Sequence, residues 1–207
     1  MESKGDKLKV DGKTKILAAA KNVIIRHGAN GATVRAIAEE ANMTTGAIYH
    51  HYKNKEDLLY DLLDESLSVS SQIAKEVTNE SFSKELVKEE IVQNTANRFY
   101  KDAENRLQYH FAHDVLLGNM DAQAKLKVKY SEWTKQIEQL LIHLYGLENT
   151  RLNQAFSSWL IGAIDGVVLQ YLLDVNENSI DEMMEVFEIL LDEGLESFVE
   201  RLNEKGK

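Results

Sequence analysis

One short stretch of the chain, TTGAIYHH, places hydroxyl, phenol and imidazole groups next to one another. Ile48 and Tyr52 are four residues apart and would share the buried face of a helix. That register leaves Tyr49, His50 and His51 on the outer face, where they can donate and accept hydrogen bonds. Side chains of these types on an exposed helix suit contacts with the base edges and phosphates of duplex DNA.

Two short helices and a tight turn are needed to position these side chains. Thr33 and Thr44 can each cap a helix, because a threonine hydroxyl accepts a backbone N–H of the first turn. Asn42 lies between the helices and tolerates the left-handed backbone conformation that a tight turn requires. The pattern therefore predicts a helix-turn-helix motif over residues 33–52, followed by a further helix that begins near Lys55.

This part of the chain resembles the TetR family of bacterial transcription regulators. The residues that carry the resemblance, in order and spacing, are Ile16, Leu17, Ala18, Ala19, Ala20, Gly28, Ala32, Thr33, Ile37, Ala38, Ala41, Ile48, Tyr49, His51, Tyr52, Lys55 and Leu58. Asn42 and Tyr52 stand where the family usually has Gly and Phe, and both keep the physical role. The resemblance covers residues 11 to about 65, and beyond them the chain is similar only in length and helical pattern.

The resemblance and the helix geometry together indicate which residues contact DNA. Candidates for reading base edges lie at the start of the second helix of the motif: Thr44, Thr45 and Gly46. Candidates for phosphate contacts are Thr33, Tyr49, His51 and Lys55. His50 could make either contact, and Arg35 could reach a base or the backbone. For Thr33 and Thr44, capping and DNA contact are compatible.

Composition favours an all-α fold. The 207 residues include no proline, so long helices are permitted nearly everywhere, and nothing indicates strands. They include no cysteine, so a disulfide framework and a thiolate metal site are both excluded. We find neither a signal-peptide pattern nor a run of 18 apolar residues, and we expect a cytoplasmic protein with no membrane partner.

The net charge of −10 is divided unevenly along the chain. Residues 1–60 carry ten lysines and arginines against seven acids, whereas residues 61–207 carry fourteen against twenty-seven. Contacts with phosphates need local positive charge rather than a basic whole chain, and the acidic portion would confine DNA to one end. We expect a helix-turn-helix DNA-binding domain over 11–60 and a helical ligand-binding and dimerisation domain over 61–207.

About nine helices are expected in total. The first should end at Gly28, which can adopt a left-handed backbone. The expected helices after the motif are 55–77, 83–101, 104–117, 121–145, 149–174 and 179–204; the first of the chain is 13–27.

The last two expected helices differ from the others. The helix over 149–174 is apolar nearly all round, and Gly162, Ala163 and Gly166 would let another helix approach closely. The final helix carries a continuous apolar stripe with acids opposite. In the TetR family the last two helices of each subunit form a four-helix bundle with their mates, so the resemblance implies a homodimer through these helices. Both helices could instead belong only to the core of the monomer.

Aromatic and polar residues are scattered through the helices of the body, as in a cavity for a small molecule. TetR-family bodies commonly enclose such a cavity, and its occupation moves the DNA-reading heads apart. The candidate ligand-binding residues are Phe99, Tyr109, His110, His113, Trp133, Trp159 and Asp165. Ordinary core packing is the competing explanation for each aromatic residue taken singly.

Two features of the body are open to more than one interpretation. Asp165 lies in an apolar run, where an unpaired charge would be costly. It could hydrogen-bond across a dimer, orient a ligand or lie at an exposed edge. His110 with His113 or Asp114 could share one helix face and bind a divalent metal or a polar ligand.

These patterns predict a ligand-responsive transcription regulator, most simply a repressor that binds a palindromic operator as a dimer. A small molecule would release it, because ligand and DNA each weaken the binding of the other. The alternative is a helical metal-binding protein or enzyme built on His110 and His113. Against an enzyme, the chain has no Glu-x-x-His pair, Gly-rich phosphate loop or nucleophile elbow. We expect no catalytic residues, metal or cofactor.

Overall fold

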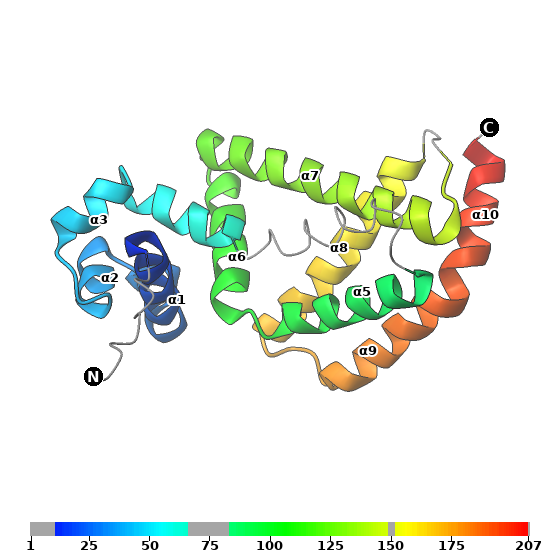
Figure 1. The fold of residues 1–207 in the computed structure, drawn as a ribbon, viewed down its shortest axis with the longest axis horizontal. Coiled ribbons are helices and arrows are strands. Elements are labelled where there is room, and N and C mark those ends of the chain that lie inside the picture. Colours follow the sequence, from blue (N-terminus) through cyan, green and yellow to red (C-terminus); the bar gives the residue numbers. More distant parts are fainter. Residues whose placement is uncertain (1–10, 66–82, 149–151, 207) are drawn as a thin grey trace, which may run out of the picture. The chain divides into compact units, whose positions relative to one another are not determined.

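The computed structural model describes residues 11–65, 83–148 and 152–206 (Figure 1). It divides into two compact units, with the division after Glu65. All regular structure within the described ranges is helical.

The N-terminal unit contains α1 (Gly12–Gly31), α2 (Val34–Glu40), α3 (Thr45–His51) and a helical segment over residues 55–65. Each helix contributes an apolar face to one core, as the spacing of apolar residues predicts. The fully buried side chains of this core include Ile16, Ile24, Ile37, Ile48, Leu58, Leu59 and Leu63. The expected helix over 55–77 is confirmed as far as residue 65, and its remainder lies outside the described residues.

The end of α1 differs from the prediction. Gly28 has φ 70° and ψ 172°, so the helix breaks there, but a further helical turn continues to Gly31. Glycine adopts this positive φ without steric cost, which explains why the break falls at Gly28. The residue therefore acts as a kink rather than as the end of the helical region.

The second unit contains the helices of the body. Their bounds are α5 (Lys84–Phe99), α6 (Asp102–Leu116), α7 (Met120–Tyr145), α8 (Asn153–Leu172), α9 (Ile180–Ile189) and α10 (Leu195–Gly206). The expected bounds agree within a few residues wherever the structure describes the chain. α8 packs chiefly against α7, and it also contacts α5 and α6.

Short local signals begin and end these helices. Ser179 begins α9 with a capping box, in which its hydroxyl accepts from the Glu182 N–H while the Glu182 carboxylate accepts from the Ser179 N–H. The Asn119 side-chain oxygen caps α7 by accepting from the Ala122 N–H at 3.0 Å. Gly146 ends α7 with φ 67°, the left-handed conformation that glycine provides at a helix C-terminus.

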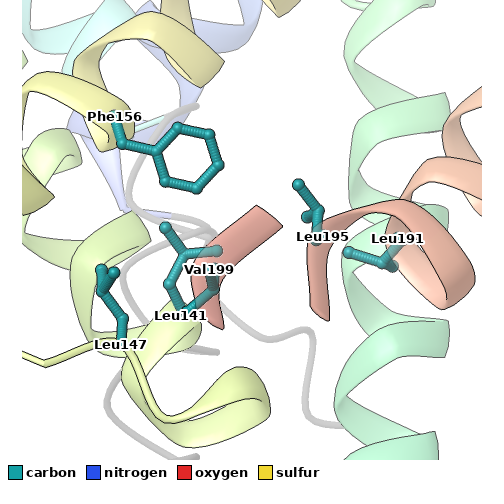
Figure 2. Close-up of a cluster of buried hydrophobic side chains, with 6 residues drawn as sticks. All are labelled: Leu141, Leu147, Phe156, Leu191, Leu195 and Val199. Carbon is teal, nitrogen blue, oxygen red and sulfur yellow. The ribbon is translucent and has the colours of Figure 1, made fainter. Parts of the chain in front are cut away.

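A cluster of buried apolar side chains joins the ends of α7, α8 and α10 (Figure 2). Its members are Leu141, Leu147, Phe156, Leu191, Leu195 and Val199. Burial of each large apolar side chain stabilises a fold by about 1.5–3 kcal/mol. This cluster holds the C-terminal helix against the rest of the body.

The final helical region was predicted as one helix and is interrupted in the structure. Residues Leu190–Gly194 form one π-helical turn between α9 and α10. The Tyr145 hydroxyl on α7 donates a hydrogen bond to the Leu191 carbonyl in this turn. A tertiary contact therefore satisfies a carbonyl within the irregular turn.

Candidate nucleic-acid interface and effector cavity

A hydrogen-bonded turn sets the angle between α2 and α3. Asn42 adopts φ 53°, and its N–H donates to the Glu39 carbonyl at 3.1 Å. The Met43 N–H donates to the Ala38 carbonyl at 2.9 Å, which closes the end of α2. The left-handed residue expected at Asn42 is confirmed.

Helix α3 presents one buried and one exposed face. The Thr44 hydroxyl accepts from the Ala47 N–H at 3.2 Å and so begins the helix. Ile48 is 1% exposed, whereas Tyr49 on the opposite face is 56% exposed. His50 and His51 are exposed beside Tyr49, and their rings meet edge to face at 5.5 Å.

Tyr52 locks α3 to the rest of the N-terminal unit. Its ring is buried, and its hydroxyl donates to the Asp61 carboxylate at 2.7 Å. Lys13 on α1 pairs with the same carboxylate at 2.9 Å. Burial and the Asp61 carboxylate raise the pKa of Tyr52 well above its usual value, so the hydroxyl remains a donor.

Eight of the nine candidate DNA contacts are exposed in the structure: Thr33, Arg35, Thr44, Thr45, Gly46, Tyr49, His50 and His51. Lys55, the ninth, is half-buried at the start of its helical segment. The Thr33 hydroxyl caps α2 by accepting from the Ala36 N–H at 3.1 Å. Arg35 forms an ion pair with Glu39 at 2.9 Å along α2, so a DNA contact would exchange one acidic partner for another.

Residues 16–62, which contain this motif, match the family model of bacterial regulatory proteins of the tetR family. Over these residues the chain is similar to the TetR family. The curated repressor AcnR of Corynebacterium glutamicum is 35% identical over 72 residues, which are 35% of this chain and 38% of AcnR. The chain thus matches little more than a third of the length of that relative.

Solved structures are similar over most of the chain. A transcriptional regulator from Rhodococcus superimposes with a TM-score of 0.68 at 18% identity, covering 90% of this chain and 97% of that regulator. FadR of Bacillus subtilis in complex with stearoyl-CoA superimposes with a TM-score of 0.65 at 19% identity, covering 87% and 97%. These likenesses extend the TetR-family fold to the body.

The body contains two adjacent cavities, an apolar lobe and a polar lobe, that share part of their lining. The apolar lobe has a volume of about 320 Å³ and is lined by residues that include Phe99, Leu144, Trp159, Ala163, Val167 and Met184. The polar lobe has a volume of about 150 Å³ and is lined by residues that include Asn94, Thr95, Arg98, Trp133, Gln136 and Asp165. The residues common to both linings are Ile91, Thr95, Ile137, Leu140 and Ile164.

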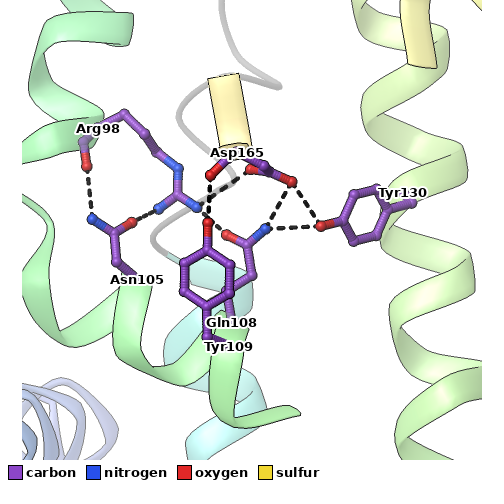
Figure 3. A network of polar contacts seen from close by, with 6 residues as sticks. All are labelled: Arg98, Asn105, Gln108, Tyr109, Tyr130 and Asp165. Atoms are coloured by element: carbon purple, nitrogen blue, oxygen red, sulfur yellow. Dashed lines mark hydrogen bonds and ion pairs between the residues drawn. The ribbon is translucent and has the colours of Figure 1, made fainter. Parts of the chain in front are cut away.

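A hydrogen-bond network forms one wall of the polar lobe (Figure 3). The Asp165 carboxylate accepts from the Tyr130 hydroxyl at 2.7 Å and from the Gln108 amide at 3.0 Å, both through Oδ2. Its backbone carbonyl accepts from the Tyr109 hydroxyl at 2.5 Å. Arg98 lies 3.9 Å from Asp165 Oδ1. Asp165 therefore has intramolecular partners on α5, α6 and α7, and its side chain is 19% exposed rather than lying at an open edge.

Arg98 has its own set of partners. Its guanidinium donates to the side-chain oxygens of Asn105 and Gln108, and its carbonyl accepts from the Asn105 amide at 3.0 Å. Burial lowers the pKa of Arg98, and the Asp165 carboxylate opposes that effect. Burial raises the pKa of Tyr109 to about 12, so its phenol stays protonated at neutral pH.

The structure brings together some, but not all, of the predicted ligand residues. Phe99 and Trp159 line the apolar lobe, Trp133 and Asp165 line the polar lobe, and Tyr109 supports Asp165. His110 and His113 are absent from both linings. His110 lies 3.9 Å from Asp114, and no group of three or more His, Cys, Asp or Glu side chains suited to a metal occurs among the described residues.

Sequence reasoning missed Arg98, Asn105, Gln108 and Tyr130. A signal for Arg98 was present, because it lies seven residues after Ile91 and so falls on the inward face of α5. Neither Gln108 nor Tyr130 has such a signal. Their role depends on α8 bringing Asp165 between α6 and α7.

Proposed function

We propose that this protein is a ligand-responsive transcription regulator that binds duplex DNA through α3. The observation that carries the proposal is the outer face of α3, on which Tyr49, His50 and His51 project while Ile48 is buried beneath them. Exposed hydroxyls at Thr44 and Thr45 precede these side chains in the first turn. An exposed recognition helix with such groups suits the major groove.

We also propose a symmetric dimer, because two motifs can then read two half-sites of a palindrome. We assign the interface to α8 and the last helical region. Trp159 is 65% exposed on α8, and Phe198 is 47% exposed on α10. A Cβ built on Gly162 or Gly166 meets no atom within 4 Å, so this face of α8 is open to a partner helix.

Helix α8 is also long and apolar enough to cross a membrane by length and composition, with only 17% of its apolar window buried. We propose that a second copy of the chain covers the apolar face of α8. Asp165 in the middle of α8 holds polar partners from α6 and α7, which a membrane-spanning helix would have to carry into lipid. We therefore propose a cytoplasmic dimer.

The two adjacent lobes together are the proposed effector site. The volume of the apolar lobe, about 320 Å³, falls within the usual range for small-molecule sites. FadR of Bacillus subtilis, which has a similar fold, was solved in complex with stearoyl-CoA, and AcnR is a transcriptional repressor. We infer that this chain is likewise a repressor, and that a small molecule in the cavity lowers its affinity for DNA.

The first experiment measures operator binding by the full chain. Duplexes selected from random sequence should yield a palindrome that binds at least about 10³-fold more tightly than unselected DNA at moderate salt. Thr45→Ala should weaken binding to the selected duplex, because a good base contact discriminates by about 1–3 kcal/mol. Lys55→Gln should weaken binding to all sequences and reduce the salt dependence.

A matched control lies on the body. Lys135→Gln removes one positive charge from an exposed position on α7 and should leave DNA affinity unchanged. Selection that recovers no preferred sequence, or equal effects of Lys55→Gln and Lys135→Gln, would contradict the proposed function.

A further inference from the structure

Resting on the proposed function, we propose that the effector is an elongated amphiphile with a hydrocarbon tail and an uncharged head group that donates a hydrogen bond. The tail lies in the apolar lobe, and the head group lies at Asp165 in the polar lobe.

The apolar lobe offers few hydrogen-bonding groups. Its lining is apolar except for Thr95, which it shares with the polar lobe, the Trp159 indole N–H and Tyr145. The Tyr145 hydroxyl already donates to the Leu191 carbonyl. A polar group placed in this lobe would lose most of its hydrogen bonds to water without replacement, so the lobe selects hydrocarbon.

One molecule can occupy both lobes. Five residues line both, and they come from α5, α7 and α8. The two lobes are therefore adjacent, and the proposed ligand is a linear chain that extends past Thr95 and Ile164 from one lobe into the other. This adjacency favours a long ligand over two separate small ones.

The charge of the polar lobe is already balanced. Among the described residues that line it, Arg98 is the only cation, and Asp165 Oδ1 lies 3.9 Å from the guanidinium. The carboxylate of Glu104, whose residue is 3% exposed, also acts on Arg98. An anionic head group would meet the Asp165 carboxylate without a free cation to offset it, and a cationic head group would meet Arg98. Both would have to leave water, which disfavours either charge.

Asp165 Oδ1 is the hydrogen-bond acceptor that faces the head group. Oδ2 accepts from both Tyr130 and Gln108, whereas the only described partner of Oδ1 is Arg98, at a distance longer than a hydrogen bond. A carboxylate oxygen accepts two hydrogen bonds and donates none. A hydroxyl or amide N–H on the ligand is therefore the matching group.

Calorimetric titration of the full chain with four ten-carbon probes tests this assignment. The probes are 1-decanol, decanamide, decanoate and decyltrimethylammonium, each below its micelle concentration. We expect decanol and decanamide to bind at least tenfold more tightly than decanoate or the ammonium. Across alcohols from hexanol to decanol, affinity should rise by roughly fourfold per methylene, as expected for burial of CH₂ groups. Equal or tighter binding of decanoate, or no dependence on chain length, would overturn the proposal.

The variant Asp165→Asn tests the charge argument directly. It keeps the shape of the side chain but leaves Arg98 without its nearest carboxylate, so the affinity for decanoate should rise at least tenfold relative to that for decanol. Asp121→Asn, at an exposed position near the start of α7, should leave all four affinities unchanged. If circular dichroism shows that Asp165→Asn fails to fold, Val167→Phe in the apolar lobe should abolish the advantage of decanol over hexanol while folding is retained. Unchanged probe preferences in a folded Asp165→Asn protein would refute the assignment.

The design separates this inference from the proposed function. Probe binding is measured without DNA, and operator binding is measured without probe. A protein that binds decanol but selects no operator would refute the regulator and leave the ligand assignment standing. A protein that selects an operator but binds none of the probes would refute only the ligand assignment.

Discussion

Two tyrosines three residues apart, Tyr49 and Tyr52, lie in opposite environments. Tyr49 projects from α3 and is 56% exposed, whereas Tyr52 is buried and donates to Asp61. We expect Tyr52→Phe to lower the free energy of unfolding of the N-terminal unit by about 0.5–1.5 kcal/mol through the lost hydrogen bond. Both tryptophans, Trp133 and Trp159, belong to the other unit. Urea unfolding should therefore shift when followed by far-ultraviolet circular dichroism and not when followed by tryptophan fluorescence.

The matched variant for this prediction is Tyr49→Phe. It should leave both unfolding transitions unchanged and weaken operator binding, because its hydroxyl faces solvent. Loss of stability in Tyr49→Phe, or none in Tyr52→Phe, would show that the two side chains have been assigned to the wrong faces.

The turn between α2 and α3 should contribute to the stability of the N-terminal unit. Asn42 has φ 53°, a conformation that costs most residues with a Cβ roughly 1–2 kcal/mol, whereas asparagine tolerates it and glycine adopts it at almost no cost. Asn42→Ala should therefore destabilise the N-terminal unit, whereas Asn42→Gly should leave it as stable or more so. Thermal unfolding followed by circular dichroism compares the two. Equal melting temperatures for the two variants would mean that the turn does not hold this backbone conformation in solution.

For the whole molecule, we predict a dimer whose interface includes α8. Gly162→Leu places its side chain in open space within one protomer but between the helices of the proposed interface. We expect sedimentation equilibrium to give the wild type twice the chain mass of 23.5 kDa and the variant the mass of one chain. Gln123→Leu adds a similar side chain to an exposed position on α7 and should remain dimeric. A dimeric Gly162→Leu protein with wild-type stability would move the interface away from α8.

The sequence alone was enough to predict the helices and the helix-turn-helix domain. Caps at Thr33 and Thr44, together with the spacing of apolar residues, are local signals, so the helices and the helix-turn-helix motif follow from neighbours in the chain. The same signals predict α3 and its exposed face, because a helix places every third or fourth residue on one side.

Only the tertiary structure decided which residues border the cavity that we propose as the effector site. Asp165 meets Tyr130 and Gln108 across 35 and 57 residues of chain, and no local pattern specifies which helices meet. His110 and His113 share the helical spacing that marked them as candidates, yet α6 presents Gln108 and Tyr109 to Asp165 instead. Helical periodicity shows which residues share a face, but packing among four helices determines which face borders the cavity, and that depends on contacts between residues far apart in the chain.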